Sequence, residues 1–159
     1  MKKENTSLSL PKKQVDLVMD LYSSDKIDEA IDMIKALNED YPNVPLLFNL
    51  LGACYNKLRQ FDPAAQFFET AISIKPDYAE AFLNHGIVMR EVGKLDHAAK
   101  NFKKATEINP SYTLAHLNLG ITLSNLGQKD EAIKCFEGVL SLDPDNSLAN
   151  EKLKELNSD

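Results

Sequence analysis

The sequence predicts an all-α solenoid built from helix-turn-helix hairpins, and a fixed internal period is the main evidence. Prolines recur every 34 residues (76−42, 110−76 and 144−110). When the sequence is divided into repeats that begin at residues 11, 45, 79 and 113 and these are aligned, other aligned positions (columns) also hold the same kind of residue in every repeat. The twentieth position, for example, is always alanine, and the twenty-fourth is always large and apolar. The residues in these three columns are Pro42, Pro76, Pro110 and Pro144; Ala30, Ala64, Ala98 and Ala132; and Ile34, Phe68, Phe102 and Phe136. A period of this length is typical of stacked two-helix units.

Each repeat has the apolar spacing of two helices separated by a turn. In the second repeat, Phe48, Leu51 and Tyr55 follow the pattern i, i+3 and i+7, and the pattern resumes after residue 62. We expect the second helix to start at Asp62-Pro63, with the carboxylate as N-cap and proline in the first turn. Gly93 and Gly127 occupy the turn in later repeats, where a left-handed residue is favoured. The periodic prolines should end each second helix.

The small and large columns predict how the helices pack. Glycine at position eight (Gly52, Gly86 and Gly120) and alanine at position twenty allow the two helices to approach closely, and the large residues at positions four and twenty-four fill the space beside them. Because one hairpin cannot bury both faces, neighbouring hairpins must stack. The predicted organisation is a flexible N-terminus at 1–10, a degenerate first repeat at 11–44, further repeats at 45–78, 79–112 and 113–146, and a polar capping helix at 147–159.

Composition and charge disfavour several classes of partner. The net charge is −6, from 18 basic and 24 acidic residues, which disfavours nucleic-acid binding. No stretch approaches the ~20 apolar residues of a membrane span, and the N-terminus lacks the apolar core of a secretory signal. Cys54 and Cys135 lie far apart and outside any Cys/His cluster, so we expect buried, reduced thiols. Together these features predict a cytoplasmic protein.

Catalytic and metal-binding patterns are missing from the sequence. His85 and His116 replace apolar column residues, and His97 follows an aspartate near a helix start, so packing and capping roles are expected. None of them shares a helix face with a cysteine or a second histidine. No phosphate-binding glycine loop or nucleophile elbow occurs. We therefore expect no enzyme activity, no cofactor and no metal.

The columns resemble the tetratricopeptide repeat, whose pattern is an aromatic residue, Leu-Gly, Tyr, Ala, Phe, Ala and Pro in fixed order. The second repeat matches throughout with Phe48, Leu51-Gly52, Tyr55, Ala64, Phe68, Ala71 and Pro76. The third repeat departs at His85 and Met89, the fourth at His116, Leu123 and Val139, and the first keeps only Leu17, Ala30 and Pro42. The resemblance covers residues 11–146 and implies a right-handed superhelix.

In this family the first helix of each hairpin lines a concave groove that commonly holds a peptide or a partner helix. By that resemblance, the groove positions are two, five, six, nine, twelve and thirteen of each repeat. The candidate peptide-binding residues are Asn49, Asn56, Leu83, Asn84, Ile87, Arg90, Leu117, Asn118, Ile121 and Asn125. Ala53, Lys57, Glu80, Glu91 and Ser124 occupy further groove positions.

Asn84 and Asn118 fall at the same position one repeat apart. An asparagine side chain offers a donor and an acceptor, so a spaced pair can bind a peptide backbone. The pair is similar to the asparagine ladder of O-linked N-acetylglucosamine transferases, although the equivalent positions in the first two repeats are Asp16 and Leu50. The alternative is that both asparagines are ordinary solvated residues on a helix face.

Chaperone-docking members of the family grip a chain-end carboxylate with Lys, Asn, Asn, Lys and Arg. The corresponding residues here are Val15, Met19, Leu50, Glu80 and Asn84, or, one repeat later, Asn49, Ala53, Asn84, Leu114 and Asn118. Neither set contains a cation that could pair with the carboxylate. We therefore predict no binding to chaperone C-terminal peptides.

Three functions fit these observations. The first is a stand-alone interaction scaffold or adaptor that binds a protein or peptide partner, without nucleic acid or membrane. The second is the N-terminal, substrate-recruiting region of a larger enzyme of the glycosyltransferase or sulfotransferase type, although Met1 suits a natural start and the chain ends soon after its capping helix. The third is a self-assembling scaffold, because an open solenoid leaves its end hairpins uncovered; the polar last helix favours a monomer or weak self-association.

Overall fold

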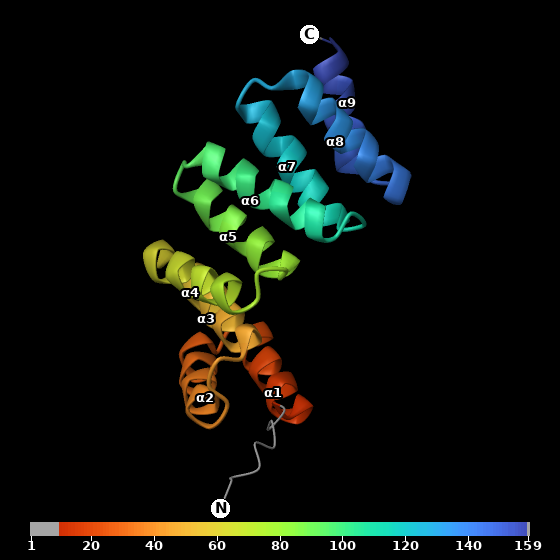
Figure 1. Ribbon diagram of the computed structural model, residues 1–159. Coiled ribbons are helices and arrows are strands. Elements are labelled where there is room, and N and C mark those ends of the chain that lie inside the picture. Colours follow the sequence, from red (N-terminus) through yellow and green to blue (C-terminus); the bar gives the residue numbers. More distant parts are fainter. Residues whose placement is uncertain (1–9, 159) are drawn as a thin grey trace, which may run out of the picture. The chain divides into compact units, whose positions relative to one another are not determined.

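The computed structural model describes residues 10–158, which form nine α-helices and no strand (Figure 1). Residues 1–9 and 159 lie outside the described part, and with them most of the N-terminal segment expected to be flexible. The helices are α1 Lys12–Ser23, α2 Ile27–Asp40, α3 Pro45–Lys57, α4 Phe61–Ile74, α5 Ala79–Glu91, α6 Leu95–Ile108, α7 Thr113–Asn125, α8 Lys129–Leu142 and α9 Ser147–Ser158. The fold is therefore the predicted all-α solenoid of helix-turn-helix repeats.

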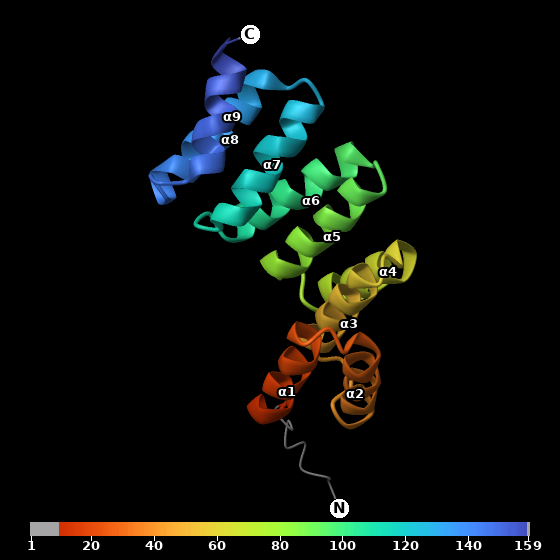
Figure 2. The ribbon, with the colours of Figure 1, turned by 180° about the vertical axis from the view of Figure 1, so that it is seen from behind.

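The chain forms two compact units. Met1–Ile74 contains the hairpins α1–α2 and α3–α4, and Lys75–Asp159 contains α5–α6, α7–α8 and the last helix α9. Within the second unit, α6 packs on α7 and α8 packs on α9, in addition to the contacts inside each hairpin. Each hairpin can be followed from both sides in Figures 1 and 2.

The prolines end the second helices as predicted. Helices α2, α4, α6 and α8 each end two residues before a proline of the period, and the next helix begins three residues after that proline. Proline disfavours helical backbone in the residue before it, so the helix cannot continue through this point. The proline period therefore sets the helix boundaries.

One left-handed residue closes the turn of every hairpin. Gly93 and Gly127 have φ of 77° and 75°, as expected, and the same position is filled by Asp25 (62°) and Arg59 (58°) in the first two hairpins. In the third turn, the Gly93 and Lys94 N–H groups donate to the Arg90 and Met89 carbonyls. This is the Schellman arrangement, which satisfies carbonyls at the end of the first helix.

Glycine at position eight and phenylalanine at position twenty-four form the contact between the two helices, or seam, of the second, third and fourth hairpins. A Cβ atom added at Gly52, Gly86 or Gly120 would lie 2.6–2.8 Å from the ring of the phenylalanine sixteen residues later. Those rings, of Phe68, Phe102 and Phe136, are fully buried. The glycine thus makes room for an aromatic ring of the second helix, so the expected close approach is confirmed.

One expectation about a helix end was wrong. Helix α4 begins at Phe61, so Asp62 lies in its first turn and is not the N-cap. There the carboxylate still interacts favourably with the helix dipole. Helix α9 buries Ala149, and Asn146 caps this helix through its Oδ1, which accepts the Ala149 N–H at 3.0 Å.

Within residues 10–158, none of the helices combines the length and apolar character that crossing a bilayer requires.

Candidate peptide-binding face

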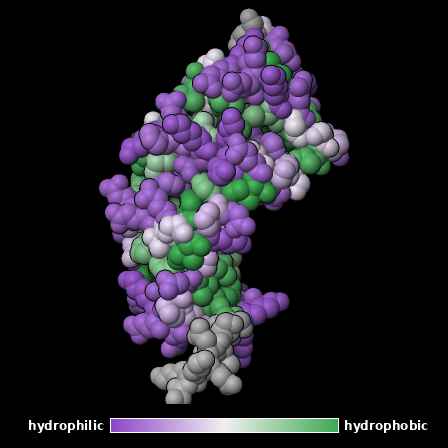
Figure 3. Space-filling model, in the orientation of Figure 1, coloured by the Kyte–Doolittle hydropathy of each residue, from purple (hydrophilic) through white to green (hydrophobic). Residues whose placement is uncertain are grey.

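The second unit presents one surface made by its two neighbouring first helices, α5 and α7, which contact each other. We call this surface the α5–α7 face and define it by the expected groove residues on these helices. They are Leu83, Asn84, Ile87 and Arg90 on α5, and Leu117, Asn118, Ile121 and Asn125 on α7, to which the structure adds exposed Leu114 of α7. The space-filling view shows hydrophilic residues over much of the molecule, with hydrophobic patches among them (Figure 3).

Arg90 and Asn118 are joined across the α5–α7 face. The Arg90 guanidinium donates to Asn118 Oδ1 at 2.7 Å, and its carbon lies 5.8 Å from the centre of the Phe102 ring. Asn118 Nδ2 donates in turn to the Leu114 carbonyl at 2.8 Å. A guanidinium carries five N–H donors, so the half-buried Arg90 keeps further donors for a ligand, whereas Asn118 is only 7% exposed.

Apolar side chains surround this polar pair. Leu114 is 48% exposed, which makes it one of the most exposed large apolar residues in the described chain. Ile87, Leu117 and Ile121 are half-buried, and Asn125 is exposed at the end of α7. Leu83 is 2% exposed and so cannot contribute much surface to a ligand. The α5–α7 face therefore combines hydrogen-bond donors with accessible apolar area.

The candidate residues of α3 belong to the first unit. Asn49 is buried, with 1% of its surface exposed, whereas Asn56 is half-buried. Lys57 is engaged elsewhere: its Nζ lies 3.0 Å from Asp25 Oδ1 and donates to the Tyr22 carbonyl at 3.0 Å. Lys57 thus links α3 to the turn of the first hairpin, a structural role that the groove position alone did not suggest.

The sequence predicts the same peptide-binding role for Asn84 and Asn118, but their surroundings in the structure differ. Asn118 is only 7% exposed, and its oxygen already accepts the Arg90 hydrogen bond, whereas Asn84 is half-buried. Arg90 stands at position twelve and Asn118 at position six of the following repeat. Sequence reasoning assigned both positions to the groove but did not predict that the two side chains would bond to each other.

The thiols and histidines have structural surroundings. Burial raises the pKa of Cys54 and of Cys135 to about 11 despite the nearby Lys57 ammonium in the first case, so neither thiol is activated. Cys54 is buried as expected, but Cys135 is only half-buried. His85 is buried on α5, and His116 Nε2 donates to the Pro110 carbonyl at 2.9 Å. No group of three or more His, Cys, Asp or Glu able to hold a metal occurs among the described residues.

Sequence models of the Tetratricopeptide repeat match two segments, residues 45–78 and residues 89–156, which together span more than half of the chain. The chain belongs to the tetratricopeptide repeat family. Curated relatives of this repeat chain include the peroxisomal targeting signal receptors of Candida glabrata (29% identical over 83 residues) and Saccharomyces cerevisiae (28% over 89 residues). The matches cover 52% and 56% of this chain but only 14% of each receptor.

Solved structures share the repeat fold over most of the chain. The crystal structure of MamA matches with a TM-score of 0.81 and 20% identity, covering 89% of this chain and 82% of MamA. YrrB, described as a tetratricopeptide repeat protein with an unusual peptide-binding site, matches with a TM-score of 0.75 and 24% identity. The match covers 89% of this chain and 73% of the YrrB chain. The first tetratricopeptide repeat domain of Spaghetti (RPAP3), bound to the HSP90 peptide SRMEEVD, matches with a TM-score of 0.69 and 25% identity. The match covers 72% of this chain and 90% of the RPAP3 chain.

Proposed function

We propose that this tetratricopeptide repeat chain is a protein-interaction scaffold that holds a peptide or partner helix against the α5–α7 face. The Arg90–Asn118 pair is the observation that carries the proposal. It fixes a guanidinium and an amide side by side, at 2.7 Å, between two first helices. A ligand that approaches this pair meets N–H donors, which suit the carbonyls of a peptide backbone or the carboxylate of an acidic side chain.

The apolar residues next to the pair supply the remaining part of a binding site. Leu114 alone exposes nearly half of its surface, and Ile87 and Ile121 lie half-buried on the two helices. Burying apolar area contributes about 25 cal/mol per Å² before the costs of association are subtracted. A peptide that alternates carbonyl contacts with an apolar side chain is therefore the ligand that this face fits.

The relatives support a protein or peptide ligand in general terms. The repeat domain of RPAP3 was solved with an HSP90 peptide, and the two curated relatives are receptors for a targeting signal. This chain spans about a seventh of those receptors, so it corresponds to a binding module and not to a whole receptor.

We expect the ligand to differ from that of RPAP3. The positions that would grip a terminal carboxylate carry Leu50, Glu80 and Asn84 in one register, and the other register has no cation either. Titration calorimetry with the peptide SRMEEVD should therefore give no measurable heat of binding. A dissociation constant in the micromolar range would contradict this expectation.

The test of the proposed face is an affinity purification with matched variants. Asn84→Ala combined with Asn118→Ala should abolish capture of the partner while changing the melting temperature little. Because Asn118 holds Arg90, circular dichroism should be recorded for each variant to show that the helices persist. The matched control is Gln66→Ala with Asn150→Ala, which removes two exposed amides outside the face. Equal capture by the two double variants would refute the α5–α7 face as the binding site.

A second candidate function, self-assembly, is favoured by one observation on α1. Leu17 and Met19 are 49% and 43% exposed. Leu17 occupies the position at which Leu51 and Leu119 are buried in later repeats. Light scattering over a concentration series should show the association, and Leu17→Glu with Met19→Glu should remove it. A constant molar mass for the unaltered protein would exclude this candidate.

A further inference from the structure

The second unit contains a groove separate from the α5–α7 face. It runs between the second helices α6 and α8, with α7 as its floor, and has a volume of about 560 Å³. We call it the α6–α8 groove. Its floor is apolar, formed by Leu119 and Leu123 of α7 and by Leu126 directly after that helix, with Ala99 and Cys135 on the walls. The volume lies within the roughly 300–1,000 Å³ usual for ligand sites.

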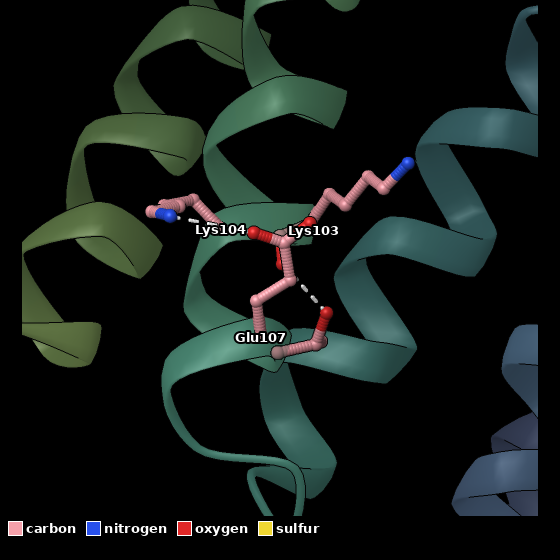
Figure 4. Close-up of polar contacts among 4 residues, drawn as sticks. Lys103, Lys104 and Glu107 are labelled. Atoms are coloured by element: carbon pink, nitrogen blue, oxygen red, sulfur yellow. Dashed lines mark hydrogen bonds and ion pairs between the residues drawn. The ribbon is translucent and has the colours of Figure 1, made fainter.

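Three lysines line the groove. Lys100 and Lys134 occupy the same repeat position on α6 and α8 (134−100 = 34), and Lys103 follows on α6. Lys103 and Lys104 extend to opposite sides of α6 (Figure 4). Lys104 pairs with Glu107 at 3.4 Å, whereas no ion pair of Lys100, Lys103 or Lys134 occurs among the described residues.

Three acidic residues also line the groove, and each lies three or four residues from one of the lysines. Asp96 and Glu131 are in the first turns of α6 and α8, where they complement the helix dipoles. Glu107 is at the other end of α6 and is already paired with Lys104. The three lysines and three carboxylates of the lining balance in charge, but none of these lysines forms an ion pair within the described residues. An acidic ligand would give them an ion-pair partner.

The floor of the groove suits a helix better than an extended peptide. His116 Nε2 on the floor already donates to the Pro110 carbonyl at 2.9 Å, and on the α6 wall the Thr106 hydroxyl donates to the Lys103 carbonyl at 2.8 Å. An extended peptide pressed on this floor would bury backbone N–H and C=O groups without partners, which is costly. A helix satisfies its own backbone and needs only an apolar face.

The length of the groove agrees with this occupant. Its lining residues on α6 run from Asp96 to Glu107, which is ~16 Å of helix at a rise of 1.5 Å per residue. About three turns of a docked helix cover the same distance. We propose that the α6–α8 groove docks an amphipathic helix of a partner protein, with leucine-like residues on the floor and glutamates facing Lys100, Lys103 and Lys134.

The test uses two synthetic peptides and the full chain. The probe is a fluorescein-labelled 14-residue helix with leucines at i, i+3 and i+4 spacing and glutamates on both flanks, and the control peptide carries lysine at every glutamate position. Fluorescence anisotropy should show saturable binding of the glutamate peptide alone. Lys100→Glu with Lys134→Glu should weaken it at least about tenfold, because each reversal replaces an attraction by a repulsion.

Matched measurements locate the bound helix. Lys154→Glu reverses a lysine charge on α9, outside the groove, and should change the affinity for the glutamate peptide by no more than about twofold. Asn84→Ala with Asn118→Ala, on the α5–α7 face, should also change it by no more than about twofold. Cys135 lines the groove, so bound peptide should slow its alkylation by a maleimide, followed by mass spectrometry on the unaltered chain. The proposal is overturned by three results: no saturable binding, equal binding of the lysine peptide, or binding that neither protects Cys135 nor responds to the reversed lysines.

Discussion

The first and third hairpins have different pairs of residues at positions eight and twenty-four, where the two helices of a hairpin pack together. In the third, Gly86 leaves the space that the Phe102 ring fills, with ring atoms 2.6 Å from where a glycine Cβ would be. In the first, the same two positions hold Val18 and Ile34, both almost fully buried. A larger residue on the first helix is thus matched by a smaller one on the second. A repeat can therefore depart from the family pattern and keep its hairpin when both positions change together.

The first and last helices, α1 and α9, differ in how much apolar side chain they expose. Helix α1 exposes Leu17 and Met19, whereas α9 buries Ala149 and surrounds it with charged residues such as Lys152 and Glu155, which pair at 2.7 Å. The last helix thus covers the fourth hairpin with a polar surface, as capping repeats do. The first hairpin has no such cover among the described residues.

Removing the large residue of a seam should have the largest effect. Phe102→Ala should lower the free energy of unfolding by about 3–5 kcal/mol, because it leaves a ring-sized cavity in a fully buried site. Ile34→Ala should cost about 2–5 kcal/mol, and less than Phe102→Ala, because a smaller side chain is removed. Urea denaturation followed by circular dichroism measures both. A loss below about 1 kcal/mol for Phe102→Ala would show that the ring does not hold the hairpin together.

The turns offer a second, smaller contrast between early and late hairpins. Left-handed backbone costs a residue with a side chain roughly 1 kcal/mol relative to glycine. Gly93→Ala should therefore destabilise the chain by about that amount, since open space around Gly93 excludes a steric cause. Arg59→Gly should stabilise it by somewhat less, because Arg59 also lies over the Phe61 ring at 5.1 Å. The same sign for both changes in thermal unfolding would contradict this explanation.

The link between the first two hairpins should contribute less still. Lys57→Met removes the contacts with Asp25 and with the Tyr22 carbonyl and retains most of the aliphatic stem. Because the ion pair is largely solvent-exposed, we expect a loss of about 0.5–1 kcal/mol that decreases in high salt. Lys154→Met, on an exposed position of α9, is the control and should change little. An equal loss in both variants, measured at low and high salt, would exclude a specific role for Lys57.

The two thiols should differ from each other in reactivity. A pKa raised to about 11 means that the thiolate fraction at pH 8 is small and grows about tenfold with each pH unit up to that pKa. Alkylation of both cysteines should therefore be slow at pH 8 and accelerate steadily above it, with Cys135 ahead of buried Cys54. Rapid modification of either thiol at pH 7 would show an activation that its surroundings do not supply.

The fold was predictable to the residue in several places because a few side chains determine it. Proline dictates where each second helix ends, and the glycine and phenylalanine columns dictate the seam. The error has a local cause: Asp62 was expected to cap α4 from outside the helix, whereas the helix begins one residue earlier, at Phe61.

The candidate site was less predictable, for a physical reason. Repeat position identified the residues of the α5–α7 face, but the bond between Arg90 and Asn118 depends on side-chain rotamers of two hairpins. The α6–α8 groove was missed because its lining comes from three helices that share no local motif. The matched lysines at positions 100 and 134, and histidine in place of an aromatic residue at 116, were the available signals.

A double-mutant cycle on the third hairpin tests the seam most directly. Gly86→Val alone should be destabilising because its Cβ would overlap the Phe102 ring, and Phe102→Ile alone should leave a cavity. The double variant recreates the Val–Ile pair of the first hairpin. We expect it to be more stable than the sum of the single losses by at least about 1 kcal/mol, which is the coupling expected for residues in direct contact. Additivity within about 0.5 kcal/mol would contradict the claim that these two columns share one volume.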